Sequence, residues 1–335
     1  MATTVNAAFS DFMENIVNLN CNDTKKALIS RDNLIDNLTC FSKDYDFFKI
    51  YSDKNLKYGS FARKTKIKPL DDIDLMICLS ADYRKYIDKD NHFYVTVNEA
   101  DKKNKLYHYN NTYYLNSTKV INRFITKLSN LNDYIKAEMH KNQEAVTLKL
   151  KSYAWNFDII PCFYTTSSFY LIPDGDGNWK KTDPRIDNNR TTNINQKFNG
   201  NLLNLIRLVK YWNNRKIVKK IGSYLLECMI LNRYEYMSGI ESSSWWIDIE
   251  FRDTLFYLAS EILDNVYDPK GIQGNLNEFD NEDRRNISSA LLCTYYKANE
   301  ATNYERNDKN QRAAINKWRE ILGNDFPTYT GRNEY

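Results

Sequence analysis

The sequence predicts an α+β protein in which helical segments at both ends of the chain flank a small mixed sheet. Three observations support this class. Apolar residues recur at helical spacing before residue 41, short β-branched and aromatic stretches occur between residues 47 and 164, and long amphipathic segments fill residues 202–322. No internal repeat interrupts this order, so we expect one sheet between two helical regions.

The chain is predicted to begin with two helices. From Thr3 to about Leu19 the apolar residues follow a helical period, and a second helix is expected from Asp23, a favourable N-cap residue, to about Phe41.

The middle of the chain has the composition of strands. Residues 72–79 (DIDLMICL) are predicted to form one strand after a strand and turn within 47–60, and two more strands are expected at 145–152 and 154–164. A polar helix is expected over about 120–139, before the last two of these strands. Gly175 to Asn178 is predicted to be a hairpin turn.

Amphipathic helices are predicted again after the sheet. They are expected at about 202–213, 224–237, 248–267, 278–299 and 308–322. The predicted organisation is therefore an N-terminal helical spine (1–45), a sheet-containing core (46–190) and a C-terminal helical lobe (191–335), which together make a bilobed protein.

Composition excludes several classes of protein. With 42% hydrophobic and 27% charged residues in 335, the chain is expected to fold, and its longest apolar runs, such as Leu75–Leu79, are too short to span a membrane. Asp11 and Glu14 interrupt any signal-peptide core, so a cytoplasmic location and no membrane partner are expected. The six cysteines lack CxxC or CxxH spacing, which argues against disulfides and zinc.

The formal net charge of +4 does not by itself indicate a nucleic-acid-binding protein. Basic residues do cluster at 63–68 and at 215–220. These clusters are either solvated edges or surfaces that attract anionic nucleotides or an activating nucleic acid.

Asp72 and Asp74 are the most informative pair of residues. Side chains alternate along a strand, so both carboxylates project to one side while Ile73 and Leu75 face the other. Two adjacent carboxylates repel unless a cation or proton lies between them, which indicates a divalent metal such as Mg²⁺ and phosphate chemistry.

Gly59 and Ser60 precede these acids by about a dozen residues. Glycine lets the backbone approach a polyphosphate closely, and serine adds a hydroxyl donor. A GS or DxD motif alone is weak evidence, but their order and spacing strengthen each other.

Asp158 lies in the otherwise apolar strand WNFDIIP. It is either an edge residue paired with a cation, or a third acid that a separate strand delivers to Asp72 and Asp74. The second interpretation matches the way in which two Mg²⁺ ions about 4 Å apart are usually held.

These motifs resemble the nucleotidyltransferase core of the polymerase-β superfamily. The surrounding sequence segments narrow the resemblance to bacterial cyclic-oligonucleotide synthases, the CD-NTases or SMODS nucleotidyltransferases. Members of that family are relatives of cyclic GMP-AMP synthase and act in anti-phage (CBASS) signalling. Those segments are FDIIPCFY, YLIPDGDGNWKKTDPR, LIRLVKYWNNRK and GSYLLE, and the resemblance covers about residues 5–325. It implies a polymerase-β-like mixed sheet.

The resemblance also implies roles for single residues. Asp72 and Asp74 would bind both metal ions, and Asp158 would bind the catalytic one and help to deprotonate the attacking ribose hydroxyl. Gly59 and Ser60 would hold the donor triphosphate.

Three residues of the helical lobe receive roles from the resemblance as well. Lys210 and Ser223 would contact phosphate, and Tyr224 would stack on the donor base. The residues themselves indicate less, because Lys210 could simply favour the end of its helix dipole and Tyr224 could be a core residue.

The implied activity is template-independent synthesis of a cyclic di- or trinucleotide from NTPs, with release of pyrophosphate. Two Mg²⁺ ions are the implied cofactor, with Mn²⁺ as a substitute. ATP, GTP or both are the implied substrates, with pyrimidine NTPs left open, and the product would reach a downstream effector. The resemblance leaves open a nucleic-acid or protein activator.

Departures from relatives limit these expectations. The zinc-binding insertion of the animal DNA sensor is absent, so no activation by duplex DNA is expected. The chain ends in Gly331-Arg332-Asn333-Glu334-Tyr335, which puts conjugation through a small C-terminal residue in doubt.

Two alternatives remain open. One is another superfamily member that transfers nucleotides to RNA or protein, and the other is a catalytically silent nucleotide-binding module.

Overall fold

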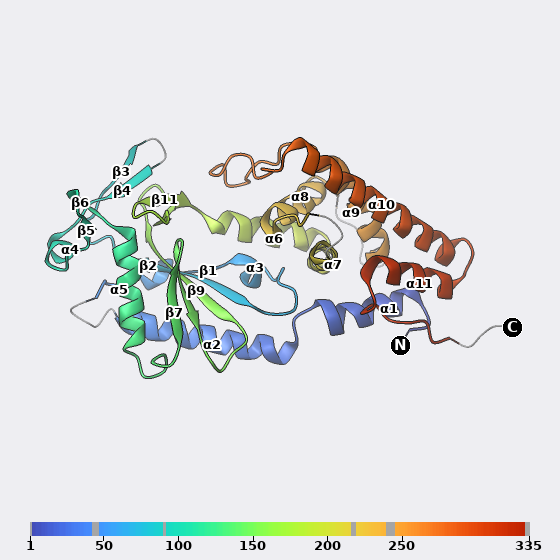
Figure 1. Cartoon of the computed structure of the whole chain (residues 1–335), viewed down its shortest axis with the longest axis horizontal. Coiled ribbons are helices and arrows are strands. Elements are labelled where there is room, and N and C mark those ends of the chain that lie inside the picture. Colours follow the sequence, from blue (N-terminus) through green and yellow to red (C-terminus); the bar gives the residue numbers. More distant parts are fainter. Residues whose placement is uncertain (1, 42–46, 90–91, 216–218, 239–244, 332–335) are drawn as a thin grey trace. The chain divides into compact units, whose positions relative to one another are not determined.

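The computed structural model describes residues 2–41, 47–89, 92–215, 219–238 and 245–331. The chain forms two compact units (Figure 1). We call residues 22–63 and 70–188 the sheet unit, and residues 1–21, 64–69 and 189–335 the helical unit. The predicted α+β class is confirmed.

The main sheet of the sheet unit has nine strands among the described residues. They are β1 (Leu56–Tyr58), β2 (Asp72–Leu79), β3 (Tyr86–Lys89), β4 (His92–Val95), β7 (Glu138–Asn142), β8 (Ala145–Lys149), β9 (Asn156–Tyr164), β10 (Tyr170–Pro173) and β11 (Trp179–Thr182). Neighbours follow the order β1-β2-β9-β10-β11-β4-β3, and β8 pairs with both β9 and β7. Only β2 and β9 are parallel in this described sheet, so their N-terminal ends lie at the same edge.

The two central strands place different residues on their two faces. Ile73 and Leu75 of β2 alternate with Asp72 and Asp74, and each of the two apolar side chains is only 1% exposed. Farther along the acidic face, Met76 of β2 belongs to an apolar cluster with residues of β8, β9 and β10. The acids therefore lie at one end of a face whose other end is a packed core.

Short helices complete the sheet unit. They are α2 (Cys21–Cys40, whose first residue belongs to the helical unit), α3 (Gly59–Ala62), α4 (Glu99–Lys103), α5 (Ser117–Ser129) and a 3₁₀ turn at Ser52–Lys54. The amphipathic α5 buries Val120, Ile121, Phe124 and Leu128 and contacts β7, β8, β9 and β10. Figure 1 shows α5 alongside these strands.

The expected helix over 120–139 is wrong in its second half. Asn130 caps α5, the turn-forming residues Asn132 and Asp133 follow, and 138–142 pair with β8 as strand β7. The sequence analysis also did not predict β3, β4, α4 or the small sheet of β5 (Tyr107–His108) and β6 (Asn111–Leu115). The predicted hairpin at 175–178 is confirmed, because it joins the antiparallel strands β10 and β11.

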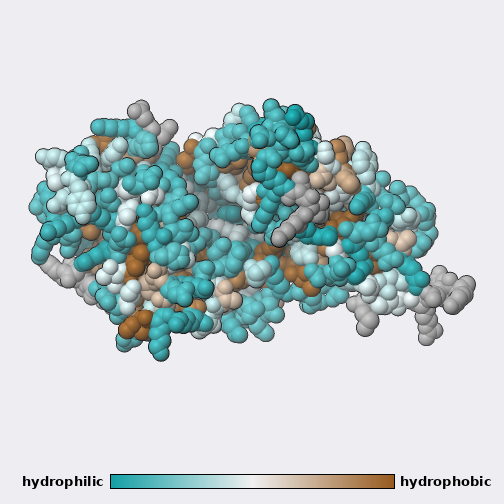
Figure 2. Space-filling model, in the orientation of Figure 1, coloured by the Kyte–Doolittle hydropathy of each residue, from teal (hydrophilic) through white to brown (hydrophobic). Residues whose placement is uncertain are grey.

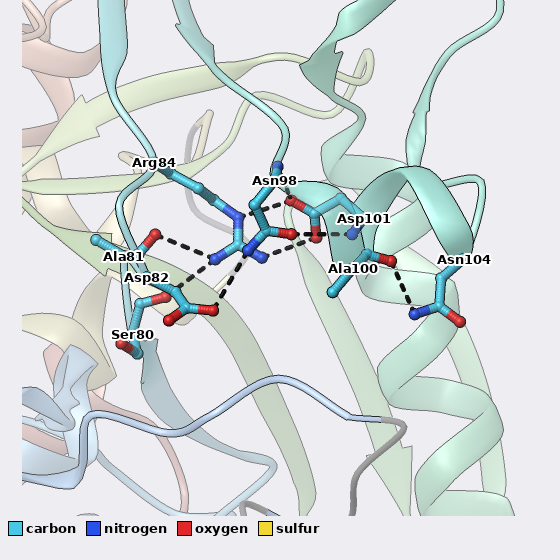
Figure 3. A network of polar contacts seen from close by, with 8 residues as sticks. All are labelled: Ser80, Ala81, Asp82, Arg84, Asn98, Ala100, Asp101 and Asn104. Atoms are coloured by element: carbon cyan, nitrogen blue, oxygen red, sulfur yellow. Dashed lines mark hydrogen bonds and ion pairs between the residues drawn. The ribbon is translucent and has the colours of Figure 1, made fainter.

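A buried ion pair fixes the loop that follows β2 (Figure 3). The Arg84 guanidinium donates to both carboxylate oxygens of Asp101 at 2.8 Å, and also to the carbonyls of Ser80 and Ala81. Asp101 accepts in addition from the backbone N–H of Asn98, which closes a capping box at the start of α4. The end of β2 that lies away from the acids is thus rigidly attached to α4.

The helical unit contains α1 (Val5–Phe12), a π-helical turn (Met13–Val17), α7 (Leu202–Asn214), α8 (Ser223–Glu235), α9 (Ile247–Glu261), α10 (Asn281–Arg306) and α11 (Gln311–Leu322). Helix α6 (Pro184–Lys197) crosses the boundary between the units. The predicted C-terminal helices are confirmed with shifted ends. The expected helix to residue 267 ends at Glu261, and α10 continues to Arg306.

Aromatic residues join the two ends of the chain within this unit. Phe9 of α1 packs edge-on against Trp318 of α11 and against Phe326, each at 5.0 Å between ring centroids. Ala2 forms a bridge with Tyr329. The first helix therefore belongs to the helical core, and the predicted spine 1–45 is divided between the units at Cys21. The predicted division at residues 45 and 190 stays a prediction.

The described surface is mostly hydrophilic on the face that Figure 2 shows, with apolar residues in small groups. No helix among the described residues has both the length and the apolar character needed to cross a membrane. Of the predicted basic cluster at 215–220, Lys216 lies outside the described residues and Lys219 pairs with Asp283.

Candidate active site

Two predicted acids face each other across the parallel strands of the sheet unit. Asp74 of β2 is directly opposite Asp158 of β9, and Asp72 is opposite Asn156. Residues paired in this way point to the same face, so the structure brings Asp74 and Asp158 together, with Asp72 two positions along the same strand. The three acids are partly exposed at the edge where both strands begin.

Two hydroxyl-bearing residues extend this row across four strands. Tyr58 of β1 is opposite Asp74, and Thr147 of β8 is opposite Asp158. The Thr147 hydroxyl donates to Asp158 Oδ1 at 2.6 Å. Burial raises the pKa of the Tyr58 phenol well above its usual value, and the charges of Asp74 and Asp158 raise it further, so Tyr58 stays protonated.

Gly59 brings the backbone against the carboxylate of Asp74. It follows Tyr58, begins the short helix α3 and has φ +74°, in the left-handed region. A Cβ atom built on Gly59 would lie 1.8 Å from Asp74 Oδ2 and 2.6 Å from its Cγ. Glycine is therefore required here for two reasons, its backbone conformation and the space that the carboxylate occupies. Ser60 follows it as the second residue of α3 and is partly exposed.

The acids fit Mg²⁺ by the chemistry of their donor atoms. Carboxylate oxygens are the ligands that Mg²⁺ prefers, and proteins usually supply only one or two of them alongside substrate phosphates and water. Across the described part of the chain, no three Asp, Glu, His or Cys side chains are gathered into a ready-made metal site. The facing carboxylates of Asp74 and Asp158 fit Mg²⁺ by the chemistry of their donor atoms, as ligands that substrate phosphates and water would complete.

Lys210 has a buried partner inside the helical unit. Its amine donates to Glu227 Oε1 at 2.7 Å and to the carbonyl of Thr65 at 3.1 Å, and its side chain is 7% exposed. The Thr65 hydroxyl donates to the same Glu227 oxygen at 2.9 Å. As placed, this lysine neutralises a buried carboxylate. The predicted phosphate contact stays a prediction.

Ser223 and Tyr224 begin helix α8. Ser223 is exposed in the first turn, while Tyr224 is half-buried and packs partly against the helical core. The Tyr224 hydroxyl donates to Asp268 Oδ1 at 3.0 Å, and the Lys270 ammonium lies 4.2 Å from the centroid of its ring. Tyr224 is packed against the core but still partly exposed, so a core role and stacking on a base are both compatible with its placement. A base would stack on the ring face opposite Lys270.

Asp268 and Lys270 are residues that the sequence analysis missed. They form an ion pair at 2.7 Å with side chains that are 0% and 5% exposed. Burial raises the pKa of the Asp268 carboxyl, but hydrogen bonds from Lys270 and from the backbone N–H groups of Gln273 and Lys270 lower it to about 2 overall. A DPKG turn gives no sequence signal for such a pair, because only the fold places it beside Tyr224.

Thr147 and Tyr58 were also missed, for a different reason. Both lie in stretches that the sequence predicts as strand, but strand pairing cannot be read from one sequence. A threonine in the alternating run AVTLKL was the only available signal.

Sequence comparisons identify relatives of this chain. No family model matches it. It is 42% identical to a probable cyclic nucleotide synthase of Bacillus cereus (strain VD146), over 98% of this chain and 99% of that protein. It is 27% identical to a cyclic AMP-AMP-AMP synthase of an Acinetobacter species (strain ATCC 27244 / 9458), over 59% of this chain and 57% of that protein.

Solved structures share the fold at low identity. CdnC of E. coli MS115-1, solved with ATP, superposes with a TM-score of 0.69 at 15% identity, over 96% of this chain and 98% of that one. The apo form of Vibrio cholerae DncV superposes with a TM-score of 0.68 at 12% identity, over 97% of each chain. These likenesses confirm the predicted fold.

Proposed function

Because this chain belongs to the bacterial CD-NTase family of cyclic nucleotide synthases, we propose that it joins NTPs into a cyclic di- or trinucleotide without a template. The observation that carries the site assignment is the cross-strand row in which Asp74 faces Asp158, with the backbone of Gly59 against Asp74. This row supports the proposal that Asp72, Asp74 and Asp158 act together beside Gly59 and Ser60.

The proposed reaction is nucleotidyl transfer. A ribose hydroxyl of one nucleotide attacks the α-phosphorus of a second NTP. A new O–P bond forms, the bond to the β-phosphate oxygen breaks, pyrophosphate leaves and the hydroxyl proton is lost. A further transfer closes the ring and releases the last pyrophosphate.

The three acids and the Gly59-Ser60 pair have defined tasks in this proposal. Asp72 and Asp74 hold two Mg²⁺ ions, for which Mn²⁺ substitutes, and Asp158 holds one of them and takes part in removing the hydroxyl proton. When bound, the ions lower the pKa of the attacking hydroxyl and neutralise charge on the reacting phosphate. Gly59 and Ser60 contact the donor triphosphate through backbone and hydroxyl groups.

The helical unit supplies the remaining nucleotide contacts in the proposal. Lys210 and Ser223 bind phosphate, and Tyr224 stacks on the donor base. ATP and GTP are the proposed substrates because relatives of the same fold have been solved with ATP and with GTP.

The proposed biological role is anti-phage signalling, in which the product activates a downstream effector. A protein activator forms part of this proposal, because CdnC has been solved in complex with a HORMA protein. The acceptor in the proposed reaction is another nucleotide, and this separates the chain from enzymes that modify RNA or protein.

Incubation with all four NTPs and Mg²⁺ or Mn²⁺, followed by phosphatase and mass spectrometry, tests the proposal. The expected result is a phosphatase-resistant cyclic nucleotide that is absent when Asp72→Ala/Asp74→Ala replaces the parent. A product that forms only when RNA or a protein acceptor is added would contradict the proposal. So would an unchanged yield from the double variant.

A further inference from the structure

Thr147 is buried beside the candidate active site, where its hydroxyl bonds to one of the acids. It is 6% exposed on β8, directly opposite Asp158 in the antiparallel register, and its Oγ1 lies 2.6 Å from Asp158 Oδ1. This length is typical of a hydroxyl that donates to an ionised carboxylate, about 2.5–2.7 Å.

Thr147 lies at the end of an apolar cluster, with His140 of β7 and Asp158 of β9 directly opposite it. Val146 and Leu148 point to the opposite face and are fully buried, while Ala145 on the same face belongs to the apolar cluster with Met76 and Ile160. A buried hydroxyl in such surroundings is unfavourable unless it is hydrogen-bonded. Here the hydroxyl donates to the carboxylate of Asp158.

Threonine is also a stiff donor. Its β-branched side chain restricts χ1, and the paired strand fixes its backbone, so the hydroxyl stays at one place relative to β9. A donor fixed in this way holds one carboxylate oxygen and thereby sets the rotation of the whole carboxylate group. The direction in which Asp158 Oδ2 points then depends on Thr147.

We propose that Thr147 is a positioning residue that orients Asp158 for binding the metal ion. This inference rests on the proposed function, because it assigns Thr147 a task at the same site. Thr147 does not touch substrate. It acts through Asp158, as residues behind a metal ligand do elsewhere, where their loss weakens metal affinity about 10- to 100-fold.

The experiment compares variants that separate the hydroxyl from the shape of the side chain. Thr147→Val removes the hydroxyl at nearly equal volume, Thr147→Ala removes it without adding a methyl group, and Thr147→Ser keeps it. Thr165→Val is the matched control, because Thr165 is another buried threonine of the sheet unit whose hydroxyl donates to a carbonyl, that of Phe169. Asp158→Asn reports whether the carboxylate itself binds metal.

Three readouts are used on the full chain. Mn²⁺ binding is followed by the EPR signal of the free ion, in the presence of an ATP analogue with a methylene bridge between the α- and β-phosphorus. Turnover of NTPs gives kcat and KM separately, and thermal unfolding without metal shows whether each variant is folded.

We expect Thr147→Val and Thr147→Ala to weaken Mn²⁺ binding about tenfold and to lower kcat by a similar factor, with KM for NTP within about twofold of the parent. Thr147→Ser and Thr165→Val should bind Mn²⁺ within about twofold of the parent. A purely structural role would lower the unfolding temperature without this loss of metal affinity.

Two results would overturn the inference while leaving the proposed function in place. One is Mn²⁺ binding and kcat in both hydroxyl-free variants that match the parent. The other is an equal loss in Thr147→Ser, which would show that side-chain volume matters and the hydroxyl does not. Failure of the proposed function has a different signature, namely a parent enzyme that forms no cyclic product and an Asp158→Asn variant that binds Mn²⁺ like the parent.

Discussion

Replacing Gly59 by alanine tests how closely the backbone and the acids are fitted together. The new Cβ would lie 1.8 Å from Asp74 Oδ2, whereas real Cβ contacts essentially never fall below 3.0 Å. The carboxylate would therefore have to retreat by about 1.2 Å, the difference between the two distances. A displacement of about 1 Å at reacting groups can lower the rate about 100-fold.

A second cost arises from the backbone. Gly59 has φ +74°, where a residue with a Cβ is destabilised by about 1–2 kcal/mol. Gly200→Ala is the matched control, because Gly200 has φ +85° and its added Cβ would meet nothing within 4 Å. The backbone cost should lower the free energy of unfolding in urea by a similar amount in both variants. Only Gly59→Ala should lose activity.

The assay is the initial rate of pyrophosphate release with saturating NTPs, together with urea unfolding of each variant. We expect kcat of Gly59→Ala to fall about 100-fold while Gly200→Ala keeps the parental rate. Equal losses of activity in the two variants would refute the reasoning, because backbone strain alone would then explain the effect. Parental activity of a folded Gly59→Ala would refute it as well.

Three further predictions concern charged groups. Asp74→Ala should abolish the cyclic product in the mass-spectrometric assay while unfolding at the parental temperature or above it, because it removes one of two facing carboxylates. The pKa of the Asp268 carboxyl is lowered from 3.8 to about 2 in the folded chain. The ionised carboxylate therefore adds about 2 kcal/mol to the free energy of unfolding above pH 4, and this contribution is lost as the pH falls through 2. Urea unfolding of Asp268→Asn should lack this acid-dependent loss, and an unchanged pH dependence would contradict the assignment. Lys210→Met should destabilise the chain by about 3–5 kcal/mol because Glu227 is left buried without its cation, and adding Glu227→Leu should restore most of that stability. A single variant as stable as the double variant would contradict the importance of the pair.

Local sequence patterns were sufficient for much of the fold. The alternation in residues 72–79 predicted a strand with two carboxylates on one face, and the helical spacing after residue 202 predicted the helices of the C-terminal region. The prediction failed where turn-forming residues compete with a helical pattern. Asn130 ends α5, and the following residues gain more by pairing with β8 than by continuing a helix.

The sequence by itself determined which chemistry the chain can carry out. Asp72 and Asp74 lie two residues apart in one strand, so their shared face follows from the strand period alone, and Gly59-Ser60 and Asp158 could be recognised by residue type. These are local properties, fixed within a few residues of the chain.

Tertiary structure decided which residues meet. The register that sets Tyr58, Asp74, Asp158 and Thr147 in one row joins two strands from residues 56–79 to two strands from residues 145–164. A shift of one residue in any of them would turn its side chain to the other face. The burial of Lys210 against Glu227 is decided in the same way, by the packing of separate helices. Pairing and burial depend on the free energy of the whole folded unit, which no local pattern contains.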